Sequence, residues 1–556
     1  MARRIRWQLV IAACSLLLVV LLMGNLALTA TSVELPDAGG SYIEATSAAP
    51  VQLNPLASDP LADPGAADIN ALVFEGLTRS GSDGYAEPGL AESWEANDAG
   101  DVYTFTLRAN LLWSDGAPLT VDDVLFTLRA VQSPGFAGDR NVAAIWREAL
   151  IERVDDRRIR CALTSPSALL PIAARFPLLP AHLLRDIPPE QWSTGSFSRN
   201  PVGAGPYILQ SLNAESATLA ANPHYYRGRP FLDTLTLEFR NDAAILAGLT
   251  RGDVAGGALL GSAETARLMV PRGYTRTARP LDSYTILSFN MRSGLLQDGG
   301  LRRALAVGLD KDALIDSIFG EDAVRLDTPV LRGWWGSTTE PLWPAADAVR
   351  ATGLLDDLGF ATGADGLRSR DGTVLRLALL TDDQPERLLA ARDIARQWGE
   401  IGIAIDVEVV ESAELRRRLD TRRFTMALHG WQRLGPDPDH YELWHSGRAA
   451  DGLNYAGLQD ERIDELIETI RQVVSDDARA AATIAFQRRW VDLTPAIVLY
   501  QPMLVHYTRS DLQGLVADAA AGREEREMLR FGREGRFVTA ASWYLRSTRE
   551  VDGGLR

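Results

Sequence analysis

The chain contains almost no cysteine. Its 556 residues include two cysteines, Cys14 and Cys161, which lie in very different sequence contexts. Two thiols cannot build a disulfide framework or a four-ligand zinc site, so a disulfide-stapled scaffold and a structural zinc domain are excluded. Cys161 lies in the strand-like stretch 159–163, where we expect it to be a small buried apolar residue. We expect neither a metal site nor a cofactor.

Positive charge is also scarce. The chain carries 57 basic residues against 73 acidic ones, for a formal net charge of −16 at pH 7, and Lys311 is its single lysine. An acidic surface repels the phosphates of nucleic acids and of anionic lipids. We therefore expect no nucleic-acid partner and no polybasic membrane-binding surface.

The sequence lacks the motifs of the common hydrolases. No G-x-S-x-G nucleophile elbow is present, and the glycines of the loop 199–207 are not followed by the Lys-Ser/Thr of a phosphate-binding loop. His440 and His445 are five residues apart, which is the wrong spacing for two zinc ligands on one helix face. His182 has no cysteine or histidine partner at metal-binding spacing, so we expect a packed structural histidine. We expect no enzymatic activity and assign no catalytic residue.

The length of the chain predicts more than one domain. A chain of 556 residues is too long for a single hydrophobic core, so two or three domains are expected. Its apolar content of 46% is ordinary for a globular protein. In the second half, strand patterns at 374–380 and 402–409 flank an amphipathic helix pattern at 385–401. This alternation favours an α/β fold.

Residues 1–30 are identified as a targeting segment and are excluded from the fold. Three arginines near the start precede an uncharged run over residues 9–23, which places the amino terminus in the cytoplasm and the rest of the chain outside. Three fates remain open: lipidation at Cys14, cleavage near Ala30, or retention as an uncleaved anchor. We favour the anchor because residues 9–30 approach the ~20 apolar residues that span a bilayer.

The most informative stretch is residues 88–128. Residues 102–107 alternate β-forming side chains as a strand with two different faces does, and a turn at 97–101 precedes them. Thr120 and Asp123 have the spacing of a capping box at the start of a helix rich in apolar residues. These patterns predict a hairpin that leads into a helix.

The residue string of this stretch resembles a known family. LAESWE, YTFTLR and WSDGAPLTVDDV are similar to the fingerprint of the extracytoplasmic solute-binding proteins of peptide-type ABC importers, which include oligopeptide-, dipeptide- and nickel-binding receptors. Further blocks follow in the family's order: LNPL at 53–56, VFEGL at 73–77, NPVGAGPY at 200–207, LRRALAVGLDKDALI at 301–315 and PAIVLY at 495–500. The resemblance covers roughly residues 41–515. Within VFEGL we expect Gly76 to take the positive-φ C′ position after a helix.

The resemblance implies an α/β fold with two lobes, the periplasmic-binding-protein type II fold, with an extra small domain in the first lobe. A strand at 285–290 is expected to cross between the lobes. The C-terminal extension lies beyond the resemblance, and its Trp543 and Tyr544 indicate that part of it packs. The expected segments are a signal or anchor at 1–30, the first lobe at 31–75, 200–285 and 496–515, the small domain at 76–199, the second lobe at 286–495, and the extension at 516–556.

The resemblance also implies where a solute would bind. Residues 426–439 are similar to a family stretch in which Gly430 and Trp431 end a strand between the lobes. Peptide-binding members take up an extended peptide partly as an added strand, and the matching positions here are Gly430, Trp431 and Gln432. Trp431 is either an aromatic wall of the site or a core residue. Tyr500 is a further pocket candidate carried over from the family.

One position departs from the peptide-binding pattern. Peptide binders place an aspartate three residues after this tryptophan to hold the ammonium group of the peptide, and this chain has Leu434 there. A buried ammonium without a carboxylate partner is strongly disfavoured, so a free amino terminus is in doubt as part of the ligand. Arg433 either favours an anion or is an exposed surface arginine.

The implied function is that of an extracytoplasmic receptor of an ABC importer, which closes two lobes over a peptide or another small solute and delivers it to the permease. The N-terminal segment is expected to hold the protein at the membrane, and a monomer is expected. The alternative is a sensor of the same fold that captures a solute and signals to a membrane partner. Permease and ATPase genes beside its own gene would favour transport.

Overall fold

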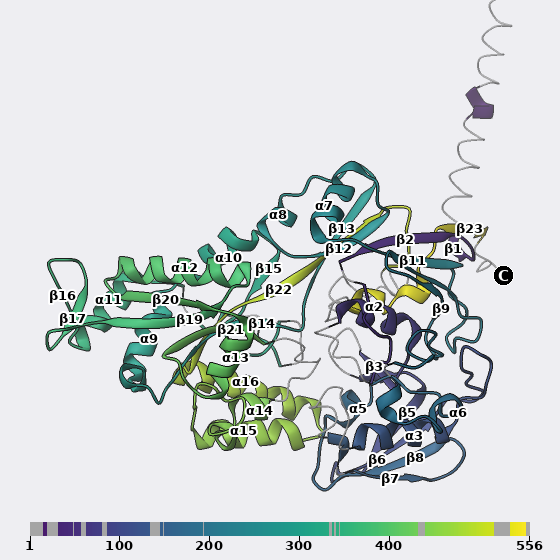
Figure 1. Cartoon of the computed structure of the whole chain (residues 1–556), viewed down its shortest axis with the longest axis horizontal. Coiled ribbons are helices and arrows are strands. Elements are labelled where there is room, and N and C mark those ends of the chain that lie inside the picture. The colour runs from purple at the N-terminus through teal and green to yellow at the C-terminus, as the bar shows by residue number, and fades with distance from the viewer. Residues whose placement is uncertain are drawn as a thin grey trace, which may run out of the picture.

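The structure is a computed structural model that describes most of the chain (Figure 1). Among the residues described, no helix combines the length and the apolar character needed to cross a membrane. The targeting segment predicted from the sequence lies outside the described residues except for residues 15–18. The described residues are 15–18, 32–47, 49–56, 63–80, 86–133, 145–147, 149–192, 194–332, 336–338, 341–343, 345–431, 440–515 and 534–551.

A twelve-stranded mixed sheet runs through the molecule. Its strand order is β20-β19-β21-β14-β22-β12-β2-β11-β10-β9, and β13 and β15 also pair with β22. The strands are β2 (Ser41–Thr46), β9 (Tyr207–Leu212), β10 (Ser216–Ala221), β11 (Thr234–Phe239), β12 (Gly256–Leu260), β13 (Tyr274–Pro280), β14 (Tyr284–Phe289), β15 (Ala323–Arg325), β19 (Arg376–Asp382), β20 (Ala404–Val410), β21 (Met426–Trp431) and β22 (Ala496–Arg509).

The long strand β22 belongs to two hydrophobic cores. Its beginning pairs with β14, and Ile497 and Leu499 pack in the core around α10 (Lys311–Phe319) and α12 (Pro385–Glu400). Its end pairs with β12 and β13, and Val505 packs in another core with Ile245 and Leu249. We call the body on β14, β15 and β19–β21 the second lobe, and the body on β2 and β9–β13 the first lobe. Figure 1 shows β22 passing from one to the other.

The chain crosses between the lobes a second time after β13. Pro280 still pairs with Met503, and β14 begins at Tyr284. The side chain of Gln501 joins the two crossings, because its amide nitrogen donates to the Leu281 carbonyl at 2.7 Å and its oxygen accepts from the Arg332 amide at 3.2 Å. We call residues 280–284 and 500–503 the hinge.

The first lobe contains a small antiparallel sheet with the order β5-β6-β8-β7. It shares a continuous hydrophobic core with β2, β9, β10 and β11. Its own elements are β3 (Thr78–Ser80), β4 (Ala86–Pro88), β5 (Ala91–Ala96), β6 (Val102–Leu107), β7 (Leu150–Arg153), β8 (Arg158–Ala162), α3 (Val121–Gln132), α5 (Leu170–Ala173), α6 (Ala181–Leu184) and η1 (Pro189–Gln191). The other elements of the first lobe are α2 (Pro64–Val73), α7 (Asp242–Arg251) and α8 (Ala263–Ala266).

The second lobe is built largely of helices on its part of the sheet (Figure 1). Helix α9 (Gly299–Val307) is separate from α10, whose N-cap residue is Asp310. Its remaining elements are η2 (Gly294–Gln297), α11 (Ala348–Asp357), β16 (Ala361–Thr362), β17 (Arg368–Arg370), β18 (Thr373–Val374), α13 (Ser412–Asp420), α14 (His440–Trp444), η3 (Ser446–Arg448), α15 (Glu461–Gln472) and α16 (Asp476–Leu493).

The predicted hairpin and helix of residues 88–128 are present. Strand β6 alternates half-buried and buried residues, as its sequence pattern predicts. The capping box is formed, since Thr120 accepts from the Asp122 amide and donates its own amide to the Asp123 carboxylate at 2.8 Å. Asp123 also accepts from the Ala181 amide at 2.9 Å, so one side chain caps α3 and fixes α6 beside it.

The prediction for Gly76 was wrong. Helix α2 ends at Val73 with Phe74 in an extended conformation, and Gly76 has no positive φ. A Cβ atom at residue 76 would lie 2.5 Å from the carbonyl oxygen of Arg175. Glycine is needed here because two backbones approach closely, and not because of a left-handed conformation.

The C-terminal part of the chain is built into the first lobe. We call residues 534–551 the C-terminal arm; it contains η6 (Glu534–Phe537), η7 (Ala540–Ser542) and β23 (Arg546–Val551). Strand β23 pairs antiparallel with β1 (Ser32–Asp37), and Trp543 is fully buried in the core shared with the small domain. The residue boundaries of the lobes stay a prediction, although the start of β22 packs in the second lobe.

Candidate functional site

The candidate site lies where strands of the second lobe end beside the hinge. Trp431, the last residue of β21, pairs with Tyr284, and Gly430 pairs with Thr285. Strand β19 ends nearby at Asp382, parallel to β21. Ligands of open α/β sheets commonly bind at the carboxyl ends of such strands.

An aromatic cluster marks the end of β21. The rings of Trp431 and Tyr455 are stacked, with centroids 5.4 Å apart and an interplanar angle of 14°. His429 meets both rings edge-on, at 5.4 Å and 5.7 Å. Tyr455 is held in place because its hydroxyl donates to the Asp420 carboxylate at 2.9 Å. Trp431 is half-buried, so one face of its ring packs on Tyr455 while part of the side chain remains accessible.

His429 is a neutral, buried partner of this cluster. Its Nε2 atom lies 2.9 Å from the Ser288 hydroxyl. Burial, together with the positive charge of Arg387, lowers the pKa of His429 to about 3. The imidazole therefore stays uncharged near neutral pH and serves packing and hydrogen bonding.

An ion pair that the sequence analysis missed lies beside Gly430. Arg387, in the first turn of α12, donates two hydrogen bonds to Asp382 at 2.6 Å and 2.5 Å, and the Ser412 hydroxyl donates a third at 3.0 Å. Burial opposes ionisation of Asp382, but the hydrogen bonds and charge of Arg387 outweigh it and hold the pKa of that carboxyl below its ordinary value. A Cβ atom at residue 430 would lie 3.0 Å from Arg387 Nη1, so Gly430 leaves room for the guanidinium.

Tyr500 and Trp431 are not brought together. The Tyr500 ring is buried against Phe319, 4.6 Å away, in the core that contains Leu287. Trp431 packs on the core that contains Tyr284, on the opposite face of β14. Burial raises the pKa of Tyr500 to about 12, so its phenol stays protonated. Gln432, Arg433 and Leu434 lie outside the described residues.

The cysteine and the histidine that could be reactive or bind a metal, Cys161 and His182, lie away from the candidate site. Cys161 is buried and burial raises the pKa of its thiol to about 12, in agreement with the predicted apolar role. The prediction that His182 is a packed histidine was wrong, because the residue is exposed and its Nε2 atom lies 2.8 Å from an Asp115 carboxylate oxygen. Within the described part of the chain, no three histidine, cysteine or acidic side chains are grouped so as to hold a metal ion.

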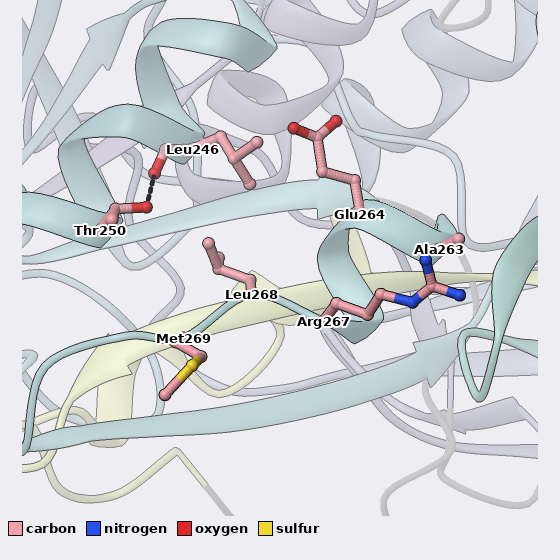
Figure 2. Close-up of a pocket in the computed structure, with 7 residues that line it drawn as sticks. All are labelled: Leu246, Thr250, Ala263, Glu264, Arg267, Leu268 and Met269. Atoms are coloured by element: carbon pink, nitrogen blue, oxygen red, sulfur yellow. Dashed lines mark hydrogen bonds between the residues drawn. The ribbon is translucent and has the colours of Figure 1, made fainter.

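A pocket of about 560 Å³ lies apart from the end of β21, between α7 and α8 of the first lobe (Figure 2). The Thr250 hydroxyl on one side donates to the Leu246 carbonyl at 2.8 Å, and Met269 on another is highly exposed. The residues that line it are Leu246, Thr250, Ala263, Glu264, Arg267, Leu268 and Met269.

Comparison with known proteins identifies the family. The family model of the bacterial extracellular solute-binding proteins, family 5 Middle, matches residues 86–451. The chain belongs to this family. The resemblance and the two-lobed α/β fold predicted from the sequence are thereby confirmed, and the protein is a solute receptor that acts outside the cytoplasm.

Several relatives of this family 5 protein match most of its length. Oligopeptide-binding protein AppA of Bacillus subtilis is 25% identical over 489 residues, covering 84% of this chain and 87% of the relative. Protein XP55 of Streptomyces lividans is 30% identical over 439 residues, covering 76% of this chain and 78% of the relative. The solved structure of AppA with a nonapeptide has a TM-score of 0.70 at 23% identity and covers 92% of this chain and 100% of that one.

Proposed function

We propose that this receptor captures a peptide-class solute between its lobes, beside the end of β21, and delivers it to an ABC permease. The main support for this proposal is that β21 is paired along its full length on one side but only in part on the other. Strand β14 pairs with all six residues of β21, whereas β19 pairs only with Met426 and Ala427. Among the described strands, the last residues of β21 therefore have a partner on one side only, which suits the addition of an extended peptide.

The proposed site combines this backbone edge with an apolar wall. The stacked rings of Trp431 and Tyr455 lie at the end of the strand and supply the wall. Binding through backbone groups gives affinity without strong sequence choice, and a flat aromatic surface tolerates many side chains. The site is proposed to include Gly430, Trp431, Gln432, Arg433 and Leu434, with Tyr500 supporting it from the other face of the sheet.

The relatives support a peptide as the solute, and Leu434 indicates which kind of peptide. AppA is named an oligopeptide-binding protein, and a dipeptide-binding protein of Escherichia coli is 24% identical over 458 residues. The sequence places Leu434 three residues after Trp431, where it offers no carboxylate to a buried ammonium. We therefore expect a preference for peptides whose amino terminus is blocked.

The wider role follows from the family. The receptor is proposed to work as a monomer, tethered to the outer side of the membrane by residues 1–30, and to hand its solute to a permease driven by ATPases. It is proposed to bind without catalysis. The neutral state of His429, the histidine in the aromatic cluster, supports this, because a group with a pKa of about 3 is a poor general acid or base at neutral pH.

The proposal is tested by peptide binding to the full-length chain in a mild detergent. Acetylated short peptides should bind and raise the melting temperature, and mass spectrometry should recover them intact. Trp431→Ala should weaken binding by at least about tenfold, since burial of a large aromatic ring against a ligand is worth about 1.5–3 kcal/mol.

Trp94→Ala is the matched control, because Trp94 is also half-buried and also packs on an aromatic ring, that of Phe105, but lies in the small domain. It should leave the dissociation constant unchanged. Equal losses in the two variants, or tighter binding of free-amine peptides, would contradict the proposed site or the proposed solute. Cleaved peptide would contradict the absence of catalysis.

A further inference from the structure

Arg279 is a buried arginine for which the described part of the chain offers no hydrogen-bond partner. It is the second-last residue of β13, next to the hinge, and it is 8% exposed. Its Nε atom is buried and makes no hydrogen bond. No described residue accepts a hydrogen bond from its guanidinium. An unpaired buried charge is strongly disfavoured, so an acceptor other than the described residues would stabilise the guanidinium.

Two other buried arginines of the protein are well supplied with acceptors. Arg302, 5% exposed, donates to the carbonyl groups of Leu296, Gln297, Leu493 and Thr494. Arg536, which is nearly completely buried, donates to two carboxylates. A buried arginine in this fold can therefore have several acceptors, so burial alone does not explain why Arg279 has none among the described residues.

Glu44, the carboxylate whose charge acts on Arg279, and Asp68, which shares Arg536 with Glu44, are already occupied. Arg279 is opposite Leu504 and shares a face of the sheet with His506, which pairs two residues further along. Glu44 accepts from Arg536 Nε at 2.7 Å and lies 2.9 Å from His506 Nε2. Asp68 accepts two hydrogen bonds from Arg536, at 2.8 Å and 2.6 Å.

The electrostatic balance at Arg279 is unfavourable. Burial lowers the pKa of its guanidinium, and the positive charge of Arg536 lowers it further. The negative charge of Glu44 opposes this shift but does not outweigh it. The described acidic groups thus do not fully compensate the positive charge that Arg279 places beside the hinge.

The position of Arg279 relates it to the proposed solute site. Tyr284, which pairs with Trp431, follows it by five residues along the hinge crossing. An extended segment of that length spans at most about 17 Å, which is the length of about five peptide residues. A short extended peptide can therefore reach both the end of β21 and the guanidinium.

We propose that Arg279 receives an anionic oxygen group of the solute, a carboxylate or a phosphate, and that this receptor therefore selects acidic or free-carboxylate peptides. The proposal rests on the proposed function and narrows its solute class. A guanidinium matches either group with two parallel hydrogen bonds, and these are stronger where water is excluded.

Calorimetric titration of the full-length chain with three probes tests the proposal. The probes are N-acetyl-tetraalanine with a free carboxylate, the same peptide as its carboxamide, and an acetylated phosphoserine tripeptide carboxamide. The free-carboxylate or phosphorylated peptide should bind at least about tenfold more tightly than the plain carboxamide, as expected for a charge-assisted pair. Whichever of the two is preferred identifies the source of the anion.

The variant Arg279→Met separates a binding role from a structural one. It should remove the preference for anionic probes, and the ligand-free variant should melt at the same or a higher temperature, because a buried unpaired charge is gone. Arg272→Met, at an exposed position before the same strand, should change neither property. A preference that survives Arg279→Met, or that is absent from the wild type, would overturn the assignment.

A lower melting temperature of ligand-free Arg279→Met would also overturn it, because the arginine would then serve to balance Glu44. If none of the three peptides binds, the peptide class under the proposed function is wrong. The assignment of Arg279 is then decided by the melting temperatures alone, with an equal or higher value for the variant supporting it and a lower value rejecting it.

Discussion

Two buried histidines of the second lobe are kept uncharged. His429 is in the aromatic cluster beside Trp431, and His440 stacks on Phe486 at 4.7 Å. Burial lowers the pKa of each to about 3, whereas a histidine in an unfolded chain titrates near 6.5. Between these values the unfolded chain binds more protons than the folded one. The stability of the protein should therefore decrease as the pH is lowered from about 6.5 toward 3.

His429→Gln should reduce this pH dependence. Each histidine contributes a slope of up to about 1.4 kcal/mol per pH unit in this window, so the variant should lose about that much of the slope. The check is urea denaturation of wild type and variant at several values between about pH 5 and 7. His224→Gln, at an exposed position, is the control and should keep the wild-type slope. An unchanged slope in His429→Gln would show that His429 does not titrate in this way.

At the scale of elements, the C-terminal arm completes the first lobe. Arg536 in η6 joins β2 and α2 through Glu44 and Asp68, and its side chain is fully buried. The hydrogen bonds and charges of His506 and Arg536 outweigh the effect of burial and lower the pKa of Glu44 to about 2. The contribution of Glu44 is therefore present above its ordinary pKa of about 4.5 and is lost as the pH falls toward 2.

Arg536→Met should destabilise the first lobe strongly. The change leaves two buried carboxylates without their guanidinium, which typically costs about 3–5 kcal/mol. Arg509→Met removes an exposed partner of Asp511 and should cost at most about 1 kcal/mol. Thermal and urea denaturation compare the two variants. Similar small losses in both would mean that the C-terminal arm contributes little to the lobe.

At the scale of the whole molecule, the lobes touch a second time, away from the hinge. The Ala168 amide in the small domain donates to the Arg471 carbonyl of α15 at 3.0 Å. Gly100 lies against Val474, since a Cβ atom at residue 100 would be 2.7 Å from its Cγ2 atom. Figure 1 shows the end of α15 beside the small domain. A receptor held at both places encloses what lies between them.

Val474→Arg should weaken this second contact and favour a more open molecule. A bulky charged side chain at the contact should increase the radius of gyration measured by small-angle scattering and weaken peptide binding by about fivefold, equivalent to about 1 kcal/mol. Val409→Arg is the matched control, because Val409 is 45% exposed and Val474 is 44% exposed, but Val409 lies in β20. Unchanged size and affinity in Val474→Arg would show that the contact does not hold the lobes together.

The sequence determined the elements whose patterns are local. The alternation of residues 102–107 and the capping box at Thr120 are both present as predicted. Such patterns depend on side chains within a few positions of one another, which share a strand face or a helix turn. The ordered family blocks likewise predicted the two-lobed fold and the family.

Tertiary structure alone decided which distant groups meet. Arg536 lies 492 positions from Glu44, and no local pattern relates the two. Gly76 was misjudged because its neighbour is the backbone at Arg175, a hundred residues away. Packing between separate elements also decides three other features. It places Tyr500 and Trp431 on opposite sides of the sheet, pairs Arg387 with Asp382, and leaves Arg279 without a hydrogen-bond acceptor among the described residues. Sequence spacing sets which face a side chain takes within its own element, but only the assembled fold determines what that face meets.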